Sequence, residues 1–211
     1  MSAVFTLENV SFAYRLRPVL EKLSFSLDAG QVTALLGPNG SGKSTLLKLL
    51  LGILRPSRGR VLFNGRDLSA YSRKEFARHV AYLPQNHRSV FAYTVEEVVL
   101  MGRLPHKGFC VPFQSQDRQL ALTSLEQLGI AQLARVPYTE ISGGEQQLTL
   151  LARAMTQGAE VFVMDEPESA LDFGNQIRLL ERVSSLAASG RTFLFSTHSP
   201  DHDASLRSVF A

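Results

Sequence analysis

Residues Gly37-Pro38-Asn39-Gly40-Ser41-Gly42-Lys43-Ser44-Thr45 decide the fold of this chain. The preceding residues, 31–36, are mostly apolar and predict a short strand, and residues 46–51 predict a buried helix. A strand, a glycine-rich turn and a helix in this order predict a site for a nucleoside triphosphate. The stretch fits the pattern G-x-x-x-x-G-K-[ST], whose fixed positions are Gly37, Gly42, Lys43 and Ser44.

The chemistry of this loop follows from its residue types. Glycines let the backbone approach a ligand closely, and successive N–H groups then surround an anion at a helix N-terminus, which carries roughly half a positive charge. Lys43 is expected to contact the β- and γ-phosphates, and the Ser44 hydroxyl is expected to bind Mg²⁺. A turn that merely joined a strand to a helix would not need Lys43 and Ser44 after its last glycine.

The bulk composition is that of one globular domain. The chain has 211 residues, of which 45% are hydrophobic and 19% charged, so a disordered protein is excluded. A net charge of +3 without long basic runs gives no reason to expect nucleic acid as a partner. The single cysteine, Cys110, suits the cytosol, and no apolar run is long enough to span a membrane, so a membrane role would be that of a peripheral subunit.

The order of apolar segments predicts an α/β fold. Residues 4–10 and 23–27 alternate and predict an antiparallel pair, and the core is expected to be a largely parallel sheet flanked by helices. A helical subdomain is expected at residues 85–140, inserted between core segments 1–84 and 141–211 of a single domain. Further strands are predicted at residues 31–36, 60–63, 80–83, 160–165 and 192–196, and further helices at 73–79, 95–103, 116–128, 146–155 and 173–188.

Two adjacent carboxylates follow an apolar strand. Ligands of open α/β sheets bind at the carboxyl ends of strands, and Asp165 and Glu166 stand at such an end. We expect Asp165 to hold Mg²⁺ and Glu166 to orient or deprotonate the water that attacks the γ-phosphate. Two solvated acids at a strand end would be the plain alternative, and the phosphate loop makes it the weaker one.

A second anion site is predicted at Ser142-Gly143-Gly144-Glu145. The residues have the spacing of a capping box at a helix start, and a serine with two glycines there leaves N–H groups for an anion. A single chain does not need both the phosphate loop and this second anion site to bind one triphosphate. The pattern therefore implies that a second protein molecule takes part.

The set of motifs resembles the nucleotide-binding subunit of ATP-binding cassette transporters, over about residues 3 to 200. The resemblance implies a homodimer in which Ser142 to Glu145 of one copy contact the ATP held by the loop of the other. It also implies that Gln85 contacts Mg²⁺, that Asp172 crosses the dimer interface, that His198 contacts the γ-phosphate, and that Tyr14 stacks on adenine. Read singly, these residues would be a loop glutamine, a helix cap, a histidine after a strand and a packed tyrosine.

A narrower resemblance concerns the cargo. Residues 81–87, 93–95 and 99–106 are similar to importers of iron–siderophore complexes, haem and cobalamin, which overlap with some molybdate importers. The resemblance implies an ATP- and Mg²⁺-dependent ATPase on the cytoplasmic face of the plasma membrane. Its partners would be membrane permease subunits and, indirectly, a substrate-binding protein.

Several alternatives stay open from the sequence. They are a soluble cassette ATPase outside transport, a kinase with the same phosphate loop, and a C-terminally truncated subunit with impaired turnover. The chain ends at Ala211, and residues 203–211 do not continue the strand pattern expected from the family. We therefore expect an uncovered sheet edge and apolar surface, and with them lowered stability or dependence on a partner.

Overall fold

The computed structural model describes residues 3–85, 92–108, 111–169, 171–198 and 207–210. Its strands are β1 (Ala3–Tyr14), β2 (Arg17–Asp28), β3 (Val32–Leu36), β4 (Arg58–Phe63), β5 (Arg66–Asp67), β6 (Val80–Leu83), β7 (Val161–Asp165), β8 (Thr192–Thr197) and β9 (Arg207–Phe210). Its α-helices are α1 (Lys43–Leu50), α2 (Arg73–Phe76), α3 (Val95–Leu100), α4 (Ser115–Gln127), α5 (Gly143–Thr156) and α6 (Phe173–Ala188). Short 3₁₀ helices are η1 (Leu68–Ala70), η2 (Met101–His106), η3 (Ala131–Leu133) and η4 (Tyr138–Glu140).

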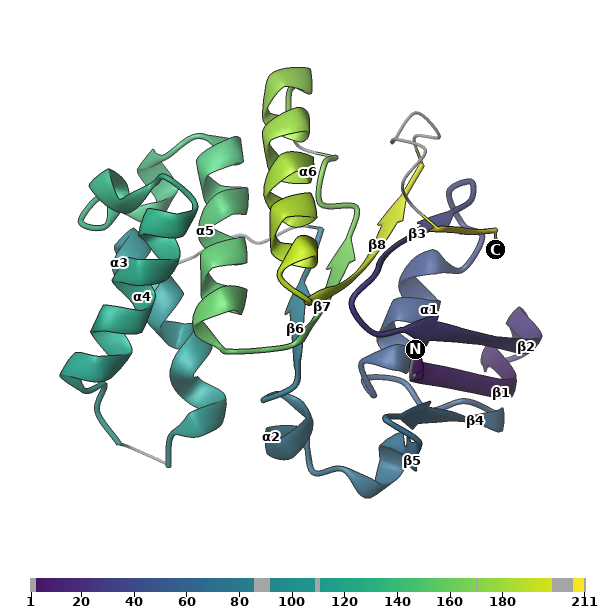
Figure 1. Ribbon diagram of the computed structural model, residues 1–211. Helices are drawn as coiled ribbons and strands as arrows, with labels where there is room; N and C mark the ends of the chain where they lie inside the picture. The colour runs from purple at the N-terminus through teal and green to yellow at the C-terminus, as the bar shows by residue number, and fades with distance from the viewer. Residues whose placement is uncertain (1–2, 86–91, 109–110, 170, 199–206, 211) are drawn as a thin grey trace.

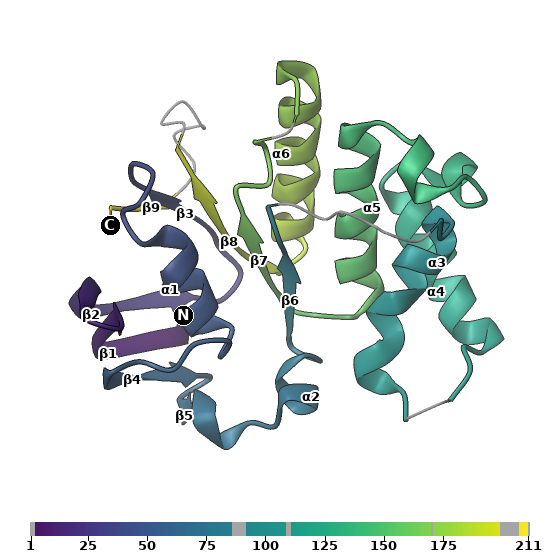
Figure 2. The same cartoon turned by 180° about the vertical axis from the view of Figure 1, so that it is seen from behind.

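Two sheets form the frame of the molecule. An antiparallel sheet has the order β2-β1-β4-β5, and a parallel sheet has the order β6-β7-β8-β3-β9. The antiparallel sheet lies on one side of the parallel sheet and α3, α4 and α5 lie on the other, as both views show (Figures 1 and 2). This confirms the α/β class with an antiparallel N-terminal sheet and helices beside a parallel core.

Side chains of the parallel sheet alternate between two buried clusters. On β7, Val161 and Val163 pack with α1, whereas Phe162 and Met164 pack in the cluster that contains residues of α5 and α6. On β8, Leu194 faces α1 and its neighbours face the other way. Because successive side chains of a strand point to opposite faces, each residue's place in the strand decides which helix it meets. The same alternation decides to which face the polar residues near the strand ends point.

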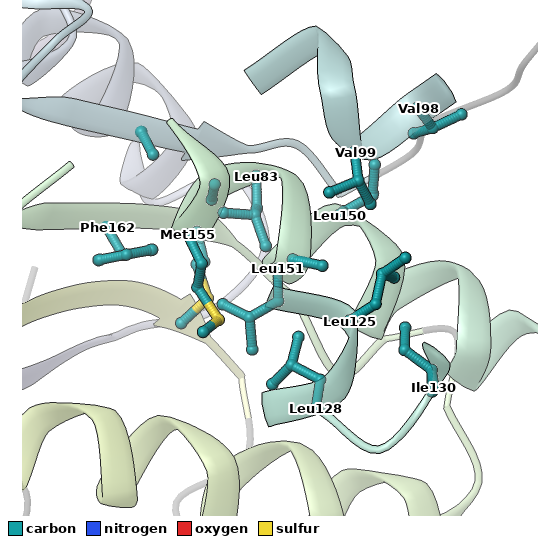
Figure 3. Close-up of a cluster of buried hydrophobic side chains, with 14 of the residues drawn as sticks. Leu83, Val98, Val99, Leu125, Leu128, Ile130, Leu150, Leu151, Met155 and Phe162 are labelled. Carbon is teal, nitrogen blue, oxygen red and sulfur yellow. The ribbon is translucent and has the colours of Figure 1, made fainter. Parts of the chain in front are cut away.

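The helices α3, α4 and α5 pack around a shared apolar centre. Figure 3 shows side chains of this cluster, with Leu83 and Phe162 from the sheet beside Leu125, Leu150 and Leu151 from the helices. Helix α5 therefore joins the helical part of the chain to the parallel sheet. The division of the chain at residues 85 and 140 stays a prediction, and α5 is the element that bridges the two parts.

Two expected helices are shorter in the structure. The helix α2 ends at Phe76, and α3 ends at Leu100, where the chain continues as the 3₁₀ helix η2 through Pro105. Proline was expected to end a longer α-helix. The tighter turn begins before it, where Gly102 comes so close to the backbone of α5 that a Cβ would collide with the Arg153 carbonyl oxygen.

The expectation of an uncovered sheet edge is wrong. Strand β9 pairs in parallel with β3, with Thr33 opposite Arg207 and Leu36 opposite Phe210. A parallel ladder is made of backbone hydrogen bonds, so it does not require the side chains that the family pattern led us to expect. The edge of β3, the strand that leads into the phosphate loop, is thereby paired.

A buried carboxylate fixes η2 against α4. The Asp117 Oδ1 atom accepts a hydrogen bond of 3.2 Å from Arg103 Nε, and Oδ2 accepts one of 2.8 Å from the Gln114 N–H and contacts Lys107 Nζ. The Lys107 hydrogen bond, followed by that of Gln114, lowers the pKa of Asp117 to about 2. One carboxylate thus holds two cations and the first turn of α4 together.

We expect this cluster to make stability depend on pH in the acid range. Because the pKa of Asp117 is lower in the folded state, its stabilisation is complete above the unfolded pKa of about 3.9 and is lost as pH falls towards the folded value. Asp117→Asn should lower the free energy of unfolding at pH 7 by about 2 kcal/mol and flatten its slope below pH ~4. Urea titrations at several pH values measure both effects. Glu126→Gln, an exposed change on the same helix, is the control, and equal curves for the two variants would contradict the assignment.

Candidate functional site

The phosphate loop joins β3 to α1 as the sequence predicts. Gly42 caps α1 with a φ of 100°, a conformation that favours glycine, and a Cβ there would lie in tight contact, 3.1 Å from the side chains of Val19 and Leu20. Lys43 is only 5% exposed, and its Nζ atom donates to the Gly37 carbonyl oxygen at 2.6 Å and the Pro38 carbonyl oxygen at 3.2 Å. The side chain of Lys43 thus folds back over the phosphate loop and is held by the loop's own backbone.

A small pocket of about 170 Å³ opens over this loop. Glu166 lies at its wall together with residues of the loop, so the structure brings the predicted base and the predicted phosphate cradle together. Val19, from β2, also lines it, and nothing in the sequence pattern distinguishes this residue from other apolar positions of the hairpin. The complete lining is Val19, Asn39, Gly40, Gly42, Lys43, Ser44, Thr45 and Glu166.

Asp165 accepts hydrogen bonds from two hydroxyl groups. Ser44 Oγ donates to Asp165 Oδ1 at 3.1 Å, and Ser196 Oγ donates to the same oxygen at 2.7 Å. Both donations use Oδ1, so neither hydroxyl engages Oδ2. Hydroxyl and carboxylate oxygens are the ligands that Mg²⁺ prefers, and a nucleotide-bound Mg²⁺ takes one or two carboxylates with phosphate oxygens and water. Ser44 and Asp165 therefore fit a magnesium site.

The backbone of Glu166 is in an unusual conformation. Its φ is 44°, a left-handed value that non-glycine residues seldom adopt and that is found at functional sites. Its N–H donates to Ser196 Oγ at 2.9 Å, and its Oε2 atom accepts a hydrogen bond of 2.7 Å from Gln85 Nε2. The other carboxylate oxygen, Oε1, lies 4.0 Å from Lys43 Nζ. Gln85 and Glu166, far apart in the sequence, are thus in direct contact.

The start of α5 is a closed capping box. The Glu145 carboxylate accepts hydrogen bonds from Ser142 Oγ at 2.7 Å and from the Ser142 N–H at 2.8 Å. The hydroxyl bond and then the backbone bond lower the pKa of Glu145. These residues do not line the pocket over the phosphate loop.

Asp172 and the start of α5 are connected through Asn175. Asp172 caps α6, where its Oδ1 atom accepts from the Asn175 N–H at 3.0 Å and its Oδ2 atom accepts from Asn175 Nδ2 at 2.7 Å. A Cβ at Gly144 would lie 2.8 Å from Asn175 Cγ, so glycine is needed for this approach of α5 to α6. The sequence predicted Gly144 and Asp172 separately, and no pattern indicated the asparagine between them.

Tyr14 and His198 occupy more peripheral places. Tyr14 is 46% exposed at the end of β1, where its ring packs edge-on against Phe12 with centroids 4.9 Å apart, and it does not line the phosphate pocket. His198 is exposed and directly follows β8. Because β7 and β8 are parallel and pair Asp165 with Ser196, His198 lies at the same end of the sheet as the carboxylates. The roles of both residues stay predictions.

Comparison with known proteins agrees with this geometry. Residues 20–169 match the protein family described as "ABC transporter". The chain belongs to the ATP-binding cassette transporter family. Members of this family hydrolyse ATP, and this cassette is accordingly an ATPase.

The cassette is similar to several import subunits. It is 39% identical to the molybdate import ATP-binding protein MolC of Haemophilus influenzae, over 95% of this chain and 75% of that one. It is 36% identical to the iron(3+)-hydroxamate import ATP-binding protein FhuC of Bacillus subtilis, over 93% of this chain and 74% of that one. A solved metal-chelate type ABC transporter in an inward-facing conformation matches with a TM-score of 0.88 and 36% identity, covering 100% of this chain and 79% of that one.

We expect Lys43→Ala to weaken ATP binding by about 10–100-fold, because a charge-assisted hydrogen bond to phosphate is worth roughly 1.5–3 kcal/mol. Isothermal titration calorimetry measures the affinity directly. Lys48→Ala, on the same helix but outside the pocket lining, is the control and should bind as the parent does. Unchanged affinity in Lys43→Ala would contradict the assigned contact.

Proposed function

We propose that this cassette is the ATP-hydrolysing subunit of a membrane importer, with a metal chelate as cargo. The observation that supports it best is that Lys43 and Gln85 each contact Glu166 beside the phosphate loop. This arrangement occurs in a chain that is similar to import subunits. The named relatives serve molybdate and iron-hydroxamate import, and the related solved transporter is of the metal-chelate type. Iron–siderophore complexes, haem and cobalamin are the cargo class proposed here, and molybdate is the nearest alternative.

The side chains around the pocket suggest a division of labour in hydrolysis. Lys43 would move from the carbonyl oxygens of its own loop to the β- and γ-phosphates. Glu166 would orient and deprotonate the attacking water with one oxygen, while Gln85 holds the other. Mg²⁺, held by Ser44, Asp165 and Gln85, would supply charge neutralisation at the phosphates. His198 would contact the γ-phosphate from the end of β8.

A second copy of the chain would complete the site. The start of α5, with Ser142 to Glu145, lies outside the phosphate pocket of its own chain, so its expected contact with ATP needs a partner. A head-to-tail pair with twofold symmetry gives two such composite sites. Asp172 would lie at the interface between the copies. ATP binding would close the pair, and hydrolysis with release would reopen it.

The membrane-spanning part of the importer is proposed to come from other chains. Within the described residues, no helix is both long and apolar enough to cross a bilayer. We propose that the cassette docks on permease subunits at the cytoplasmic face of the membrane. A binding protein would deliver cargo to that permease. A cassette acting on ribosomes or DNA is the competing function, and a small-molecule kinase would leave Ser142 to Gly144 without a role.

Glu166→Gln should abolish steady-state hydrolysis while ATP still binds. Loss of a positioned general base costs about 10²–10⁴-fold in rate. Phosphate release measures turnover, and size-exclusion chromatography with ATP should show a trapped dimer. Glu160→Gln, at the residue directly before β7 and so at the end remote from Glu166, is the matched control and should hydrolyse ATP normally. Undiminished turnover in Glu166→Gln would remove the proposed role.

Transport itself needs a reconstituted system. The cassette is co-expressed with a candidate permease, purified as a complex and placed in vesicles with an iron–siderophore, haem, cobalamin or molybdate as cargo. We expect ATP-dependent uptake of one metal complex, absent with the Glu166→Gln cassette. Failure to form a complex with the permease, together with co-purification with ribosomes or DNA, would favour the competing function.

A further inference from the structure

Ser196 is a polar residue that follows the apolar run 193–195 near the end of the buried strand β8. It lies on β8 directly opposite Asp165 of β7, and its side chain is 0% exposed. Along β8 the side chains alternate, and Ser196 shares its face with Leu194, which packs on the α1 side. Asp165 likewise shares its face with Val161 and Val163. The hydroxyl and the carboxylate therefore meet beneath the N-terminus of α1.

One hydroxyl serves both carboxylate residues. Its hydrogen goes to Asp165 Oδ1 at 2.7 Å, a charge-assisted bond, and its oxygen accepts the Glu166 N–H at 2.9 Å. Ser196 thereby fixes the side chain of one acid and the backbone of the other. An apolar residue of similar size could do neither.

The second of these bonds occurs where the regular ladder ends. Strand β7 ends at Asp165, and the next residue, Glu166, turns into the left-handed region at a φ of 44°. If the strand continued, the Glu166 side chain would point away from α1, because successive residues alternate. The left-handed turn instead brings it to the wall of the phosphate pocket, within 4.0 Å of Lys43 Nζ. A sparsely populated conformation persists only where its surroundings hold it, and the bond to Ser196 does so here.

We propose that Ser196 is a positioning residue for hydrolysis, which sets the orientation of Asp165 and the left-handed turn of Glu166 through one buried hydroxyl. The inference rests on the proposed roles of those two acids. Ser196 itself is fully buried and does not line the phosphate pocket. Its removal should therefore affect the chemical step and the Mg²⁺ requirement more than the binding of ATP.

Ser196→Ala should lower kcat by about 10–100-fold, the usual cost of losing a group that orients a metal or catalytic ligand. The KM for ATP should change less than about 3-fold, and half-maximal activity should need a higher Mg²⁺ concentration. Steady-state hydrolysis over a range of ATP and of Mg²⁺ concentrations gives all three quantities.

The matched control is Thr192→Ala. Thr192 lies on the same strand and its hydroxyl also accepts a backbone N–H, that of Gly30 at 2.9 Å, but at the end of β8 remote from Asp165. This variant should lose some thermal stability and keep the parental kcat. Equal kcat and Mg²⁺ dependence in the two variants would overturn the proposal, because both would then report only on stability.

Two further variants complete the test: Ser196→Thr, which keeps the hydroxyl, and Glu166→Gln, which removes the proposed general base. Ser196→Thr keeps a hydroxyl and should recover most of the lost kcat, and a folded Ser196→Thr as slow as Ser196→Ala would also overturn the proposal. Loss of turnover in Glu166→Gln with normal turnover in Ser196→Ala would reject the positioning role alone. Normal turnover in Glu166→Gln would reject the role of Glu166 on which the inference depends.

Discussion

The hydrogen bonds that converge on Asp165 are the interaction on which the site depends. Ser44 reaches the carboxylate from the start of α1 and Ser196 reaches it from β8, so three segments far apart in the sequence are joined at one oxygen. The parallel sheet makes this possible, because the carboxyl ends of β3, β7 and β8 lie at the same edge. The alternation of side chains along β7 and β8 then places Asp165 and Ser196 on the face occupied by α1.

Glu166 shows how the site uses backbone strain. A strand residue in the next position would point to the face of α6, among apolar side chains, where a carboxylate would be costly to bury. The left-handed turn avoids this and directs the acid to Gln85 and Lys43. The strand thus delivers its two acids in succession to one face, which a regular strand cannot do. The left-handed conformation of Glu166 costs conformational energy, and its hydrogen bonds with Ser196 and Gln85 offset that cost.

Much of the frame can be predicted from the sequence because its signals are local. The strand–loop–helix around Gly42 and Lys43 follows from glycine, lysine and serine beside apolar runs, and the box at Ser142 and Glu145 follows from helix-capping chemistry. The contacts that join segments could not be predicted in this way. The Asn175 contact with Gly144 depends on how closely two helices approach, and no spacing in the sequence encodes that distance.

The pairing of β9 and the contacts of Ser196 could not be predicted from sequence patterns, for two different reasons. The pairing of β9 with β3 uses backbone groups, which every residue except proline carries alike, so side-chain patterns gave the wrong expectation for this edge. For Ser196 there was a signal, since a serine directly follows the apolar run 193–195. It could be interpreted only once the register of β7 and β8 was known.

The register between β7 and β8 limits where insertions and deletions can occur in the sequence. Asp165 faces Ser196 because β7 and β8 pair from Val161 and Thr192 onward without a bulge. One residue inserted or deleted within either strand would turn every later side chain to the opposite face. A change in β8 would point Ser196 towards α6, a change in β7 would do the same to Asp165, and either would break the contact between the hydroxyl and the carboxylate. Gains and losses of single residues inside β7 and β8 are therefore incompatible with catalysis.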